Sequence, residues 1–249
     1  MQLDCLVFSS HKSGTQTLVH SLAASGINSR HCHVPENAGL KNGNFETYVK
    51  AYYRHNRKKL TIISVFRDPL ERHISSFFQW NGTRPLERKE VGDKTETLIF
   101  RRNTGELQHQ FIAELKNRSF PGREESIEII CDELKIDTGK LVFEIKKKSG
   151  LYETKKFRLF LLRFDLLFDD FEQILSTITG KTIRQINQNM GTEKWYAEKY
   201  LDFKQTLILP EQIIKDIYEE RKSLIEVFYT GKFDELLVLA KTKYGDRNS

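Results

Sequence analysis

The chain has 249 residues, 39% hydrophobic and 30% charged, a balance typical of a globular protein with a well-buried core. A net charge of +6, from 40 basic and 34 acidic residues, favours an anionic ligand but lacks the dense basic and aromatic stripe of nucleic-acid-binding proteins. Three cysteines show no metal-ligand spacing, no apolar run is long enough to span a membrane, and the N-terminal apolar run is too short for a signal peptide. We expect one domain, 1–249, that is cytoplasmic, holds no metal, binds no nucleic acid and has no membrane span.

Strand and helix patterns alternate over the first third of the chain. In chain order, the apolar run 4–10 is typical of a buried first strand, 27–34 is expected to be the second strand, and the apolar run 59–66 is typical of a buried third strand. Apolar residues at helical spacing predict helices over 15–25 and near 45–57. This alternation predicts right-handed crossovers and an α/β fold, a three-layer α/β/α domain with a central, mainly parallel sheet.

The rest of the chain is less regular. Its expected elements are a charged loop over about 82–104, helices over 106–116 and 126–134, a hairpin of strands 140–148 and 156–164 around Gly150, and a helix over 168–179. The C-terminal part, about 192–244, is expected to be helical, with one helix opened by Pro210 and running to about Tyr229. No linker divides the chain into domains.

The first strand is followed by HKSGTQT, residues 11–17, which has the layout of a strand, a polar loop and a helix start. Backbone N–H groups at such a helix start can cradle an anion. The lysine precedes the glycine, however, whereas a Walker A loop ends in Gly-Lys-Ser/Thr. The segment therefore predicts an anion site that differs from the ATP site of P-loop proteins.

A second candidate anion motif follows the strand at 59–66. Arg67 stands at the end of this strand, and Ser75 lies eight residues further on, in a helix that Pro69 opens. Ligands of open α/β sheets bind outside the carboxyl ends of the strands, so Arg67 and the Lys12 loop share a cleft if the first and third strands are neighbours. The alternative is that Arg67 pairs with a nearby acid, Asp68 or Glu71, while Ser75 faces solvent.

The two motifs together resemble those of the sulfotransferases that use 3′-phosphoadenosine 5′-phosphosulfate (PAPS). The family's P-K-x-G-T loop corresponds to His11-Lys12-Ser13-Gly14-Thr15, with a histidine in place of the proline, and its R-D-P-x-x-R-x-x-S motif to residues 67–75. Further likeness, to the capsular polysaccharide synthesis proteins of this superfamily, lies in LFLLRFDLL at 159–167 and in Lys194-Trp195-Tyr196. There Glu193 and Ala197 replace the asparagine and serine of the family signature.

The resemblance implies a P-loop-like fold and in-line transfer of a sulfuryl group from PAPS to a hydroxyl or amine, with adenosine 3′,5′-bisphosphate as the product. Lys12 would neutralise the leaving group, and Arg67 and Ser75 would bind the 3′-phosphate. The 5′-phosphate would be held by the loop and helix start, with Lys194 as a further phosphate candidate; these loop residues are Ser13, Gly14, Thr15, Gln16 and Thr17. No metal is needed. The acceptor implied is a bacterial glycan or its lipid-linked precursor, in polysaccharide biosynthesis.

The general base is sought at the end of the second strand, where RHCHVPEN enters the same cleft. His33 has an ordinary pKa suited to a base at neutral pH, whereas Glu36 would need burial to raise its pKa. His11 and His31 are further candidates. These histidines could instead simply hydrogen-bond the neighbouring loop.

Two other functions remain open from the sequence. A P-loop kinase or nucleotide hydrolase has the same topology, although the chain lacks Gly-Lys-Ser/Thr and an evident Walker B acid. A non-catalytic polyanion-binding module would use only the basic excess. Trp80 and Trp195 could stack on sugar rings or lie in the core, and the charged loop could hold an acceptor or be solvated.

Overall fold

The computed structural model describes residues 3–33, 45–83, 85–91, 94–97, 102–117, 125–187 and 194–246, with backbone alone over 82–97. Its contacts group into two compact units. The first, here called the sheet unit, comprises Met1–Asp68, Glu124–Gln188 and Ser223–Gly231. The second, the helical unit, comprises Pro69–Arg123, Asn189–Lys222 and Lys232–Ser249. The expectation that residues 1–249 form a single domain stays a prediction.

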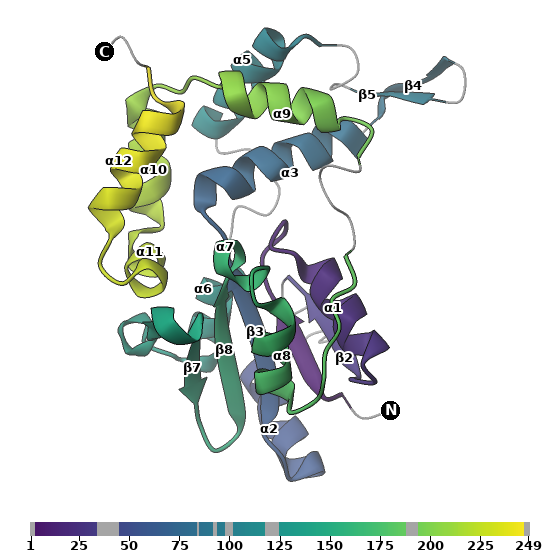
Figure 1. Cartoon of the computed structure of the whole chain (residues 1–249), viewed down its shortest axis with the longest axis vertical. Helices are drawn as coiled ribbons and strands as arrows, with labels where there is room; N and C mark the ends of the chain where they lie inside the picture. Colours follow the sequence, from purple (N-terminus) through teal and green to yellow (C-terminus); the bar gives the residue numbers. More distant parts are fainter. Residues whose placement is uncertain are drawn as a thin grey trace. The chain divides into compact units, whose positions relative to one another are not determined.

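The sheet unit is α/β and is built on six strands in the order β2-β1-β3-β8-β7-β6 (Figure 1). Parallel pairs join β2, β1, β3 and β8, whereas β7 and β6 continue the sheet in antiparallel pairs. The strand bounds are Cys5–Phe8 for β1, Ser29–Cys32 for β2, Leu60–Phe66 for β3, Phe143–Glu144 for β6, Ser149–Glu153 for β7 and Phe157–Arg163 for β8. The predicted mainly parallel sheet is confirmed, and β1 and β3 are neighbours, which was the condition for Arg67 and the Lys12 loop to share a cleft.

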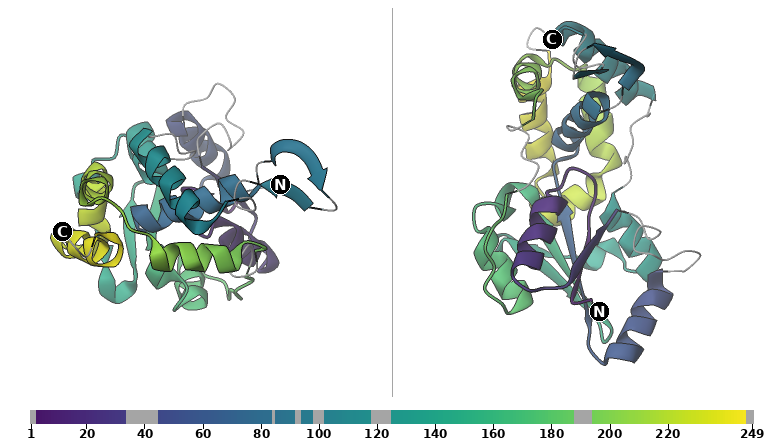
Figure 2. Two further views of the ribbon diagram at one scale, coloured as in Figure 1. Left: turned by 90° about the horizontal axis from the view of Figure 1, so that it is seen from above. Right: turned by 90° about the vertical axis from the view of Figure 1, so that its right-hand side faces the viewer.

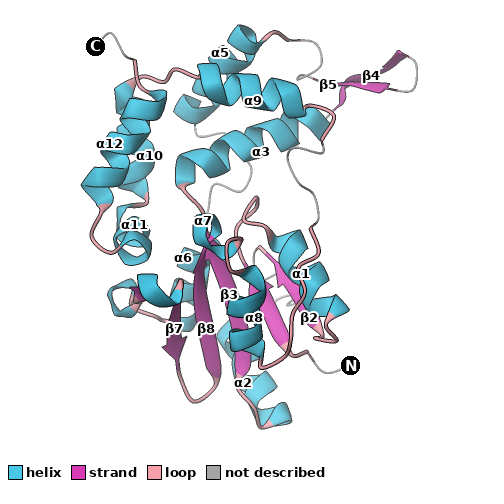
Figure 3. Ribbon diagram, in the orientation of Figure 1, coloured by secondary structure: helices cyan, strands magenta, loops and turns pink. Residues whose placement is uncertain are grey.

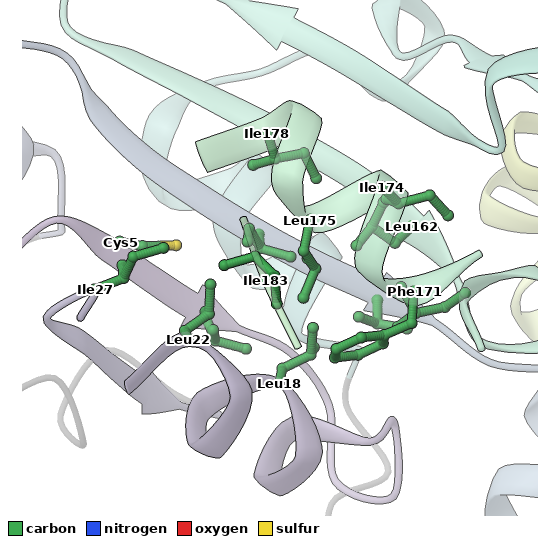
Figure 4. Packing of buried hydrophobic residues seen from close by; sticks show 14 residues of the cluster. Cys5, Leu18, Leu22, Ile27, Leu162, Phe171, Ile174, Leu175, Ile178 and Ile183 are labelled. Carbon is green, nitrogen blue, oxygen red and sulfur yellow. The ribbon is translucent and has the colours of Figure 1, made fainter. Parts of the chain in front are cut away.

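Alternating residues of the parallel strands face helices α1 and α8. The bounds of the helices of this unit are Thr15–Ala24 for α1, Phe45–Asn56 for α2, Ser126–Leu134 for α6, Phe164–Leu167 for α7, Phe171–Thr179 for α8 and Lys222–Tyr229 for α11. Figure 2 shows α1, in dark purple, beside strand β1. Val7, Ile63 and Leu162 pack against Leu18 of α1 and Leu175 of α8 in one buried cluster (Figure 4). Burial of this apolar surface fixes α1, and with it the loop that precedes α1, to the sheet.

The predicted 140–148 strand is wrong in part. Residues 143–144 form β6, but the strand that pairs with β8 along its length is β7, and the 3-10 helix Ile145–Lys147 separates the two. Thr154 N donates to Phe157 O at 2.9 Å, which closes a tight hairpin between β7 and β8. Because that turn is so short, the nearest segment in the chain takes the place beside β8.

The helical unit packs helices around a cluster of aromatic rings and adds one two-stranded ribbon (Figure 3). Its elements are α3 (Pro69–Thr83), β4 (Pro85–Val91), β5 (Lys94–Thr97), α5 (Thr104–Asn117), α9 (Ala197–Thr206), α10 (Glu211–Glu220) and α12 (Phe233–Tyr244). Phe77 contacts the rings of Phe111 and Phe203 at centroid distances of 5.2 and 5.8 Å. Among the described helices, none is long and apolar enough to cross a membrane.

Two expectations for this part of the chain need correction. The segment 82–104 is not simply a loop, because β4 and β5 pair as an antiparallel ribbon within it. The helix opened by Pro210 does not run unbroken to Tyr229, because α10 ends at Glu220 and α11 begins at Lys222.

The helices predicted over 106–116 and 126–134 are confirmed as α5 and α6. The helix expected over 168–179 is confirmed as α8, which ends at Gly180 in the left-handed conformation.

Candidate active site

The carboxyl ends of the parallel strands meet at one edge of the sheet, and most of the predicted site residues lie there. The loop with Lys12 follows β1, His33 follows β2, and Arg67 follows β3. The register Phe8↔Cys32 shows that β1 and β2 end level, and Phe66↔Arg163 shows the same for β3 and β8. Val7 pairs with Ile63, so β3 runs on past the end of β1 in the same direction. The fold therefore brings three segments far apart in the sequence to the place where open α/β sheets bind ligands.

The loop between β1 and α1 has an unusual backbone that leaves the helix start open. Lys12 and Gly14 both adopt positive φ, 65° and 74°, and Gly14 is the residue that precedes the first turn of α1. No side chain among the described residues caps this helix start, and its first turn carries no acid. The N–H groups of Thr15 and Gln16 and the positive end of the helix dipole thus suit an anion at this helix start.

The hydroxyl residues of this loop and first turn are buried. Ser13, Thr15 and Thr17 are each no more than 7% exposed, whereas Gln16 is half-buried. The Ser13 hydroxyl has no hydrogen-bond partner among the residues that the structure describes. A buried hydroxyl without a partner costs free energy, so its presence beside an uncapped helix start favours a site that receives a polar ligand.

Arg67 is anchored to this loop. Its Nη1 donates to the backbone carbonyl of Lys12 at 2.8 Å, and its guanidinium lies 4.4 Å from the centre of the Phe164 ring. Within the described part of the sheet unit, no carboxylate pairs with Arg67. The alternative that Arg67 is neutralised by Asp68 therefore has no support. The other N–H donors of the guanidinium can serve an anion beside Lys12.

Two phenylalanines that the sequence did not single out support this arrangement. A Cβ atom at Gly14 would lie 2.8 Å from Cζ of Phe168 and 3.4 Å from Cε2 of Phe164, so only glycine fits. The Phe168 ring in turn stacks on Phe171, in the core, at a centroid distance of 5.7 Å. A series of rings therefore connects the hydrophobic core to the loop and to Arg67.

Arg163, at the end of β8 next to Arg67, has a different environment. Its Nε and Nη2 donate to the two carboxylate oxygens of Asp165 at 3.1 and 2.5 Å, and its guanidinium lies 3.9 Å from the centre of the Tyr229 ring. Burial raises the pKa of Tyr229, and Asp165 and Asp68 raise it further, against the effect of Arg163. The ion pair neutralises Arg163, which leaves Arg67 as the arginine of this edge that can receive an anion.

His33 is held by the backbone at the end of β1. Its Nδ1 lies 2.5 Å from the carbonyl oxygen of Ser9, so the tautomer that carries hydrogen on Nδ1 donates there and leaves the lone pair on Nε2. Burial lowers the pKa of His33 below its ordinary 6.5; the hydrogen bond to Ser9 acts in the opposite direction and nearby His31 adds to the lowering. His33 is therefore neutral, and able to accept a proton, at neutral pH.

The other candidate histidines lie next to His33. The ring centres of His11 and His33 are 3.6 Å apart, and those of His31 and His33 are 5.2 Å apart. His11 is exposed, whereas His31 is half-buried. The structure thus gathers all three histidines at this edge, and the hydrogen bond to the Ser9 carbonyl orients the His33 ring. Glu36, the remaining candidate base, lies outside the described residues.

Glu125 is a buried neighbour of the loop that sequence reasoning missed. It is 1% exposed, and its Oε2 accepts a hydrogen bond of 2.7 Å from the Ser10 hydroxyl. The next residue, Ser126, donates from its N–H to Ser10 Oγ and from its hydroxyl to the carbonyl oxygen of His33. These bonds tie the start of α6 to both the Lys12 loop and His33. Glu125 and Ser10 are more than a hundred positions apart, so no local pattern could have paired them.

Two predicted phosphate ligands belong to the helical unit. Ser75 is half-buried on α3, and Lys194 is half-buried just before α9. Their joint action with Arg67 and Lys12 of the sheet unit stays a prediction. Glu71, the other acid weighed as a partner for Arg67, accepts hydrogen bonds from Lys204, Lys243 and Tyr244. Burial alone would raise the pKa of Glu71, but these bonds lower it to about 2.

The two tryptophans considered as sugar platforms also lie in the helical unit. Trp80 is 37% exposed and Trp195 is 58% exposed, so neither is a core residue. Within the described residues, no group of three or more histidine, cysteine, aspartate or glutamate side chains is arranged to hold a metal ion.

A scan against protein-family models and searches of curated proteins and of solved structures found no match to this chain.

Proposed function

We propose that this chain is a sulfotransferase that uses PAPS as its donor, on a three-layer α/β/α domain with a P-loop-like loop. One observation carries the proposal: Arg67, which no described carboxylate neutralises, is anchored to the Lys12 carbonyl at the uncapped start of α1. Lys12 of the first motif and Arg67 of the second therefore meet at the edge of a parallel sheet where open α/β folds bind ligands.

Several contacts support the fold details of this proposal. Helices α1 and α8 pack on one set of alternating strand residues, and α2 and α6 contact β3. The Phe8 ring, which alternates with the core residue Val7, lies 5.3 Å from the Phe45 ring of α2. This is the packing expected of a sheet covered on both faces.

The donor would bind with its 5′ end on the Lys12 loop. The first-turn N–H groups of α1 and the Ser13 hydroxyl suit a 5′-phosphate, and Arg67, assisted by Ser75, suits the 3′-phosphate that distinguishes PAPS from ATP. The Lys12 ammonium would lie where charge develops on the phosphate oxygen as its bond to sulfur breaks. A cation already in place there lowers the activation free energy of the transfer, because the protein does not have to rearrange as the charge develops.

The acceptor would attack from the side of His33. As the acceptor oxygen forms its bond to sulfur, the bond from sulfur to the 5′-phosphate breaks, and the acceptor proton passes to Nε2 of His33. The Ser9 carbonyl holds Nδ1–H and so fixes the tautomer that this step requires. A carbohydrate hydroxyl, or an amine, is the acceptor class that the resemblance favours, and exposed Trp195 offers a ring face for a sugar.

A ligand panel read by thermal unfolding tests the donor. Adenosine 3′,5′-bisphosphate without magnesium is expected to stabilise the protein, by about 2.7 kcal/mol at a concentration of one hundred times Kd. Stabilisation by ATP with magnesium alone would indicate a kinase or nucleotide hydrolase instead. Salt-sensitive binding of nucleic acid or an acidic glycan, with no response to either nucleotide, would indicate a polyanion-binding module.

The pH–rate profile tests the base. With saturating PAPS and a glycan acceptor, the rate of the parent protein is expected to fall on the acidic side as His33 becomes protonated. His33→Ala should lose most of the rate together with this acidic limb, by about 100- to 10,000-fold. If His33→Ala keeps both, His33 is not the base, and Glu36→Ala and His11→Ala are the next variants to measure.

A further inference from the structure

The antiparallel edge of the sheet unit exposes three aliphatic side chains within ten residues. Val142 is 62% exposed, Ile145 48% and Leu151 49%. Single exposed aliphatic residues are common on protein surfaces, but a group of them in one short segment points to an interaction. The segment runs from the 3-10 helix Thr138–Lys140 through β6 and the 3-10 helix Ile145–Lys147 into β7.

The strand register brings two of these side chains together. Phe143 pairs with Gly150, so the next position outward on the same antiparallel ladder sets Val142 beside Leu151. The approach is close, because a Cβ atom at Gly150 would lie 2.2 Å from the Val142 carbonyl oxygen. Leu151 also pairs with Phe160 of β8, a partly buried residue that packs against the hydrophobic core. The aliphatic pair thus continues the apolar face of the sheet to its exposed edge.

The same segment carries exposed lysines. Lys140, Lys146 and Lys147 are exposed, and Lys147 pairs with Glu144 at 2.8 Å. Lys140 and Lys146 have no ion-pair partner among the described residues. We call these six exposed residues the basic-aliphatic patch: Lys140, Val142, Ile145, Lys146, Lys147 and Leu151.

We propose that the basic-aliphatic patch binds the surface of a membrane that contains anionic lipids. Lysines that flank a two-residue edge strand discourage pairing with other strands, but that role does not call for exposed valine, isoleucine and leucine. Aliphatic side chains that enter the interface, flanked by lysines that meet anionic headgroups, suit a lipid surface. A second copy is disfavoured, because a symmetric contact would set the like charges of the two patches against each other.

The proposal is independent of the sulfotransferase proposal, and sedimentation of the full chain with lipid vesicles tests it. The protein is expected to sediment with vesicles of phosphatidylcholine mixed with phosphatidylglycerol, less so in high salt, and not with phosphatidylcholine alone. The triple variant Val142→Ser, Ile145→Ser, Leu151→Ser should bind the mixed vesicles at least about tenfold more weakly than the parent. The matched control Val238→Ser, Leu239→Ser changes two residues of α12 that are 61% and 63% exposed and should bind as the parent does.

The charge contribution is measured in the same assay. Lys140→Gln with Lys146→Gln should weaken binding by about fivefold for each lysine. The control Lys116→Gln with Lys215→Gln, at exposed positions of α5 and α10, should change it little. Absence of binding to the mixed vesicles, or equal losses in the patch and control variants, would overturn the proposal. So would a concentration-dependent dimer in light scattering that the triple serine variant abolishes, because the patch would then contact a second copy.

Discussion

The two edges of the sheet in the sheet unit are both rich in cations, yet those cations have different partners. At the amino ends of the parallel strands, Lys58 pairs with Asp4 at 3.1 Å and Lys59 with Glu153 at 2.8 Å. Lys181 donates to the Gly26 carbonyl, at the end of α1, and Arg158 to the Thr61 hydroxyl. These groups line a cavity of about 370 Å³. Cations of the amino edge thus meet carboxylates, a hydroxyl and the negative end of a helix.

At the carboxyl edge the partners are of another kind. Arg67 donates to a backbone carbonyl and lies on a phenylalanine ring, and the helix start beside it presents N–H groups. His33 is kept neutral by burial. The cations of the amino edge therefore have partners within the protein, whereas Arg67 of the carboxyl edge has no carboxylate partner among the described residues and keeps N–H donors for a ligand. The number of basic residues does not identify the site, but their contacts do.

The largest effect is expected for Lys12. Lys12→Ala should lower the turnover of sulfuryl transfer by about 100- to 1,000-fold, since the proposed mechanism relies on this cation to neutralise the leaving group. Donor affinity should change far less, because Arg67 and the helix start remain. Lys58→Ala, at the amino edge, is the matched control and should keep the parent rate. Steady-state rates at saturating donor measure both, and a turnover of Lys12→Ala within a few-fold of the parent would contradict the role.

Arg67 gives the next largest effect. Arg67→Ala should weaken binding of adenosine 3′,5′-bisphosphate by about 2 to 3 kcal/mol, roughly 30- to 160-fold, because charge-assisted hydrogen bonds to a phosphate are lost. Arg158→Ala removes an arginine of the same sheet at the other edge and should leave the affinity nearly unchanged. Isothermal titration calorimetry compares the two. Equal losses would mean that the edges do not differ as described.

Two glycines at the two ends of α1 test the rigidity of the loop. Gly14 and Gly26 have similar positive φ, 74° and 70°, but nothing lies within 4 Å of a Cβ atom at Gly26, whereas Phe168 would lie at 2.8 Å from one at Gly14. Gly26→Ala should cost about 1 kcal/mol of unfolding free energy from backbone strain alone. Gly14→Ala should cost about 2 to 4 kcal/mol, since the Phe168 ring is held by its neighbours. Urea unfolding measures both changes, and equal losses of unfolding free energy would show that the loop can move to accommodate the added methyl group at residue 14.

The smallest effect is the pH dependence of stability, which differs between the edges. The lowered pKa of His33 means that the unfolded chain binds a proton first, so stability falls as the pH drops from 6.5 through the folded pKa. For Asp4, burial raises the pKa, but hydrogen bonds from Lys58 and the Asn28 N–H outweigh it and hold the pKa below 3.8. Its contribution is present above 3.8 and is lost as the pH falls further.

Urea unfolding across pH separates these two contributions. His33→Asn should flatten the stability profile below pH 6.5, and Asp4→Asn should flatten it only in the more acidic range. The Lys58 and Asp4 side chains are substantially exposed, so the second effect should be weak and should decrease with salt. An unchanged profile for His33→Asn near neutral pH would contradict the environment described for His33.

Local sequence was enough to predict the elements on which the candidate site depends. Apolar β-branched residues marked β3, the glycine after 15–25 marked the end of α1, and the polar stretch with Lys12 and Gly14 marked the loop between them. Each of these signals lies within a few residues of the feature it indicates, so backbone preferences and hydrophobic periodicity suffice. The parallel order of the strands followed from their alternation with helices.

Predictions failed where the pairing of neighbouring strands decided the outcome. The segment 140–148 has an apolar pattern suited to a strand, but β7 occupies the position beside β8 because a tight turn joins the two. Segment 82–104 was expected to be a loop from its charge, and yet β4 and β5 pair there. Backbone pairing depends on which segment is near, and that information is not contained in composition.

The sequence by itself determined the α/β class, the loop between the first strand and its helix, and the arginine at the end of the third strand. Only the tertiary structure decided which cations of the sheet are neutralised and which are available. Glu153 pairs with Lys59 from 94 positions away, and Glu125 reaches Ser10 across more than a hundred positions. The physical reason is that the electrostatic state of a side chain depends on the groups packed around it, and the folding of distant segments brings those groups together.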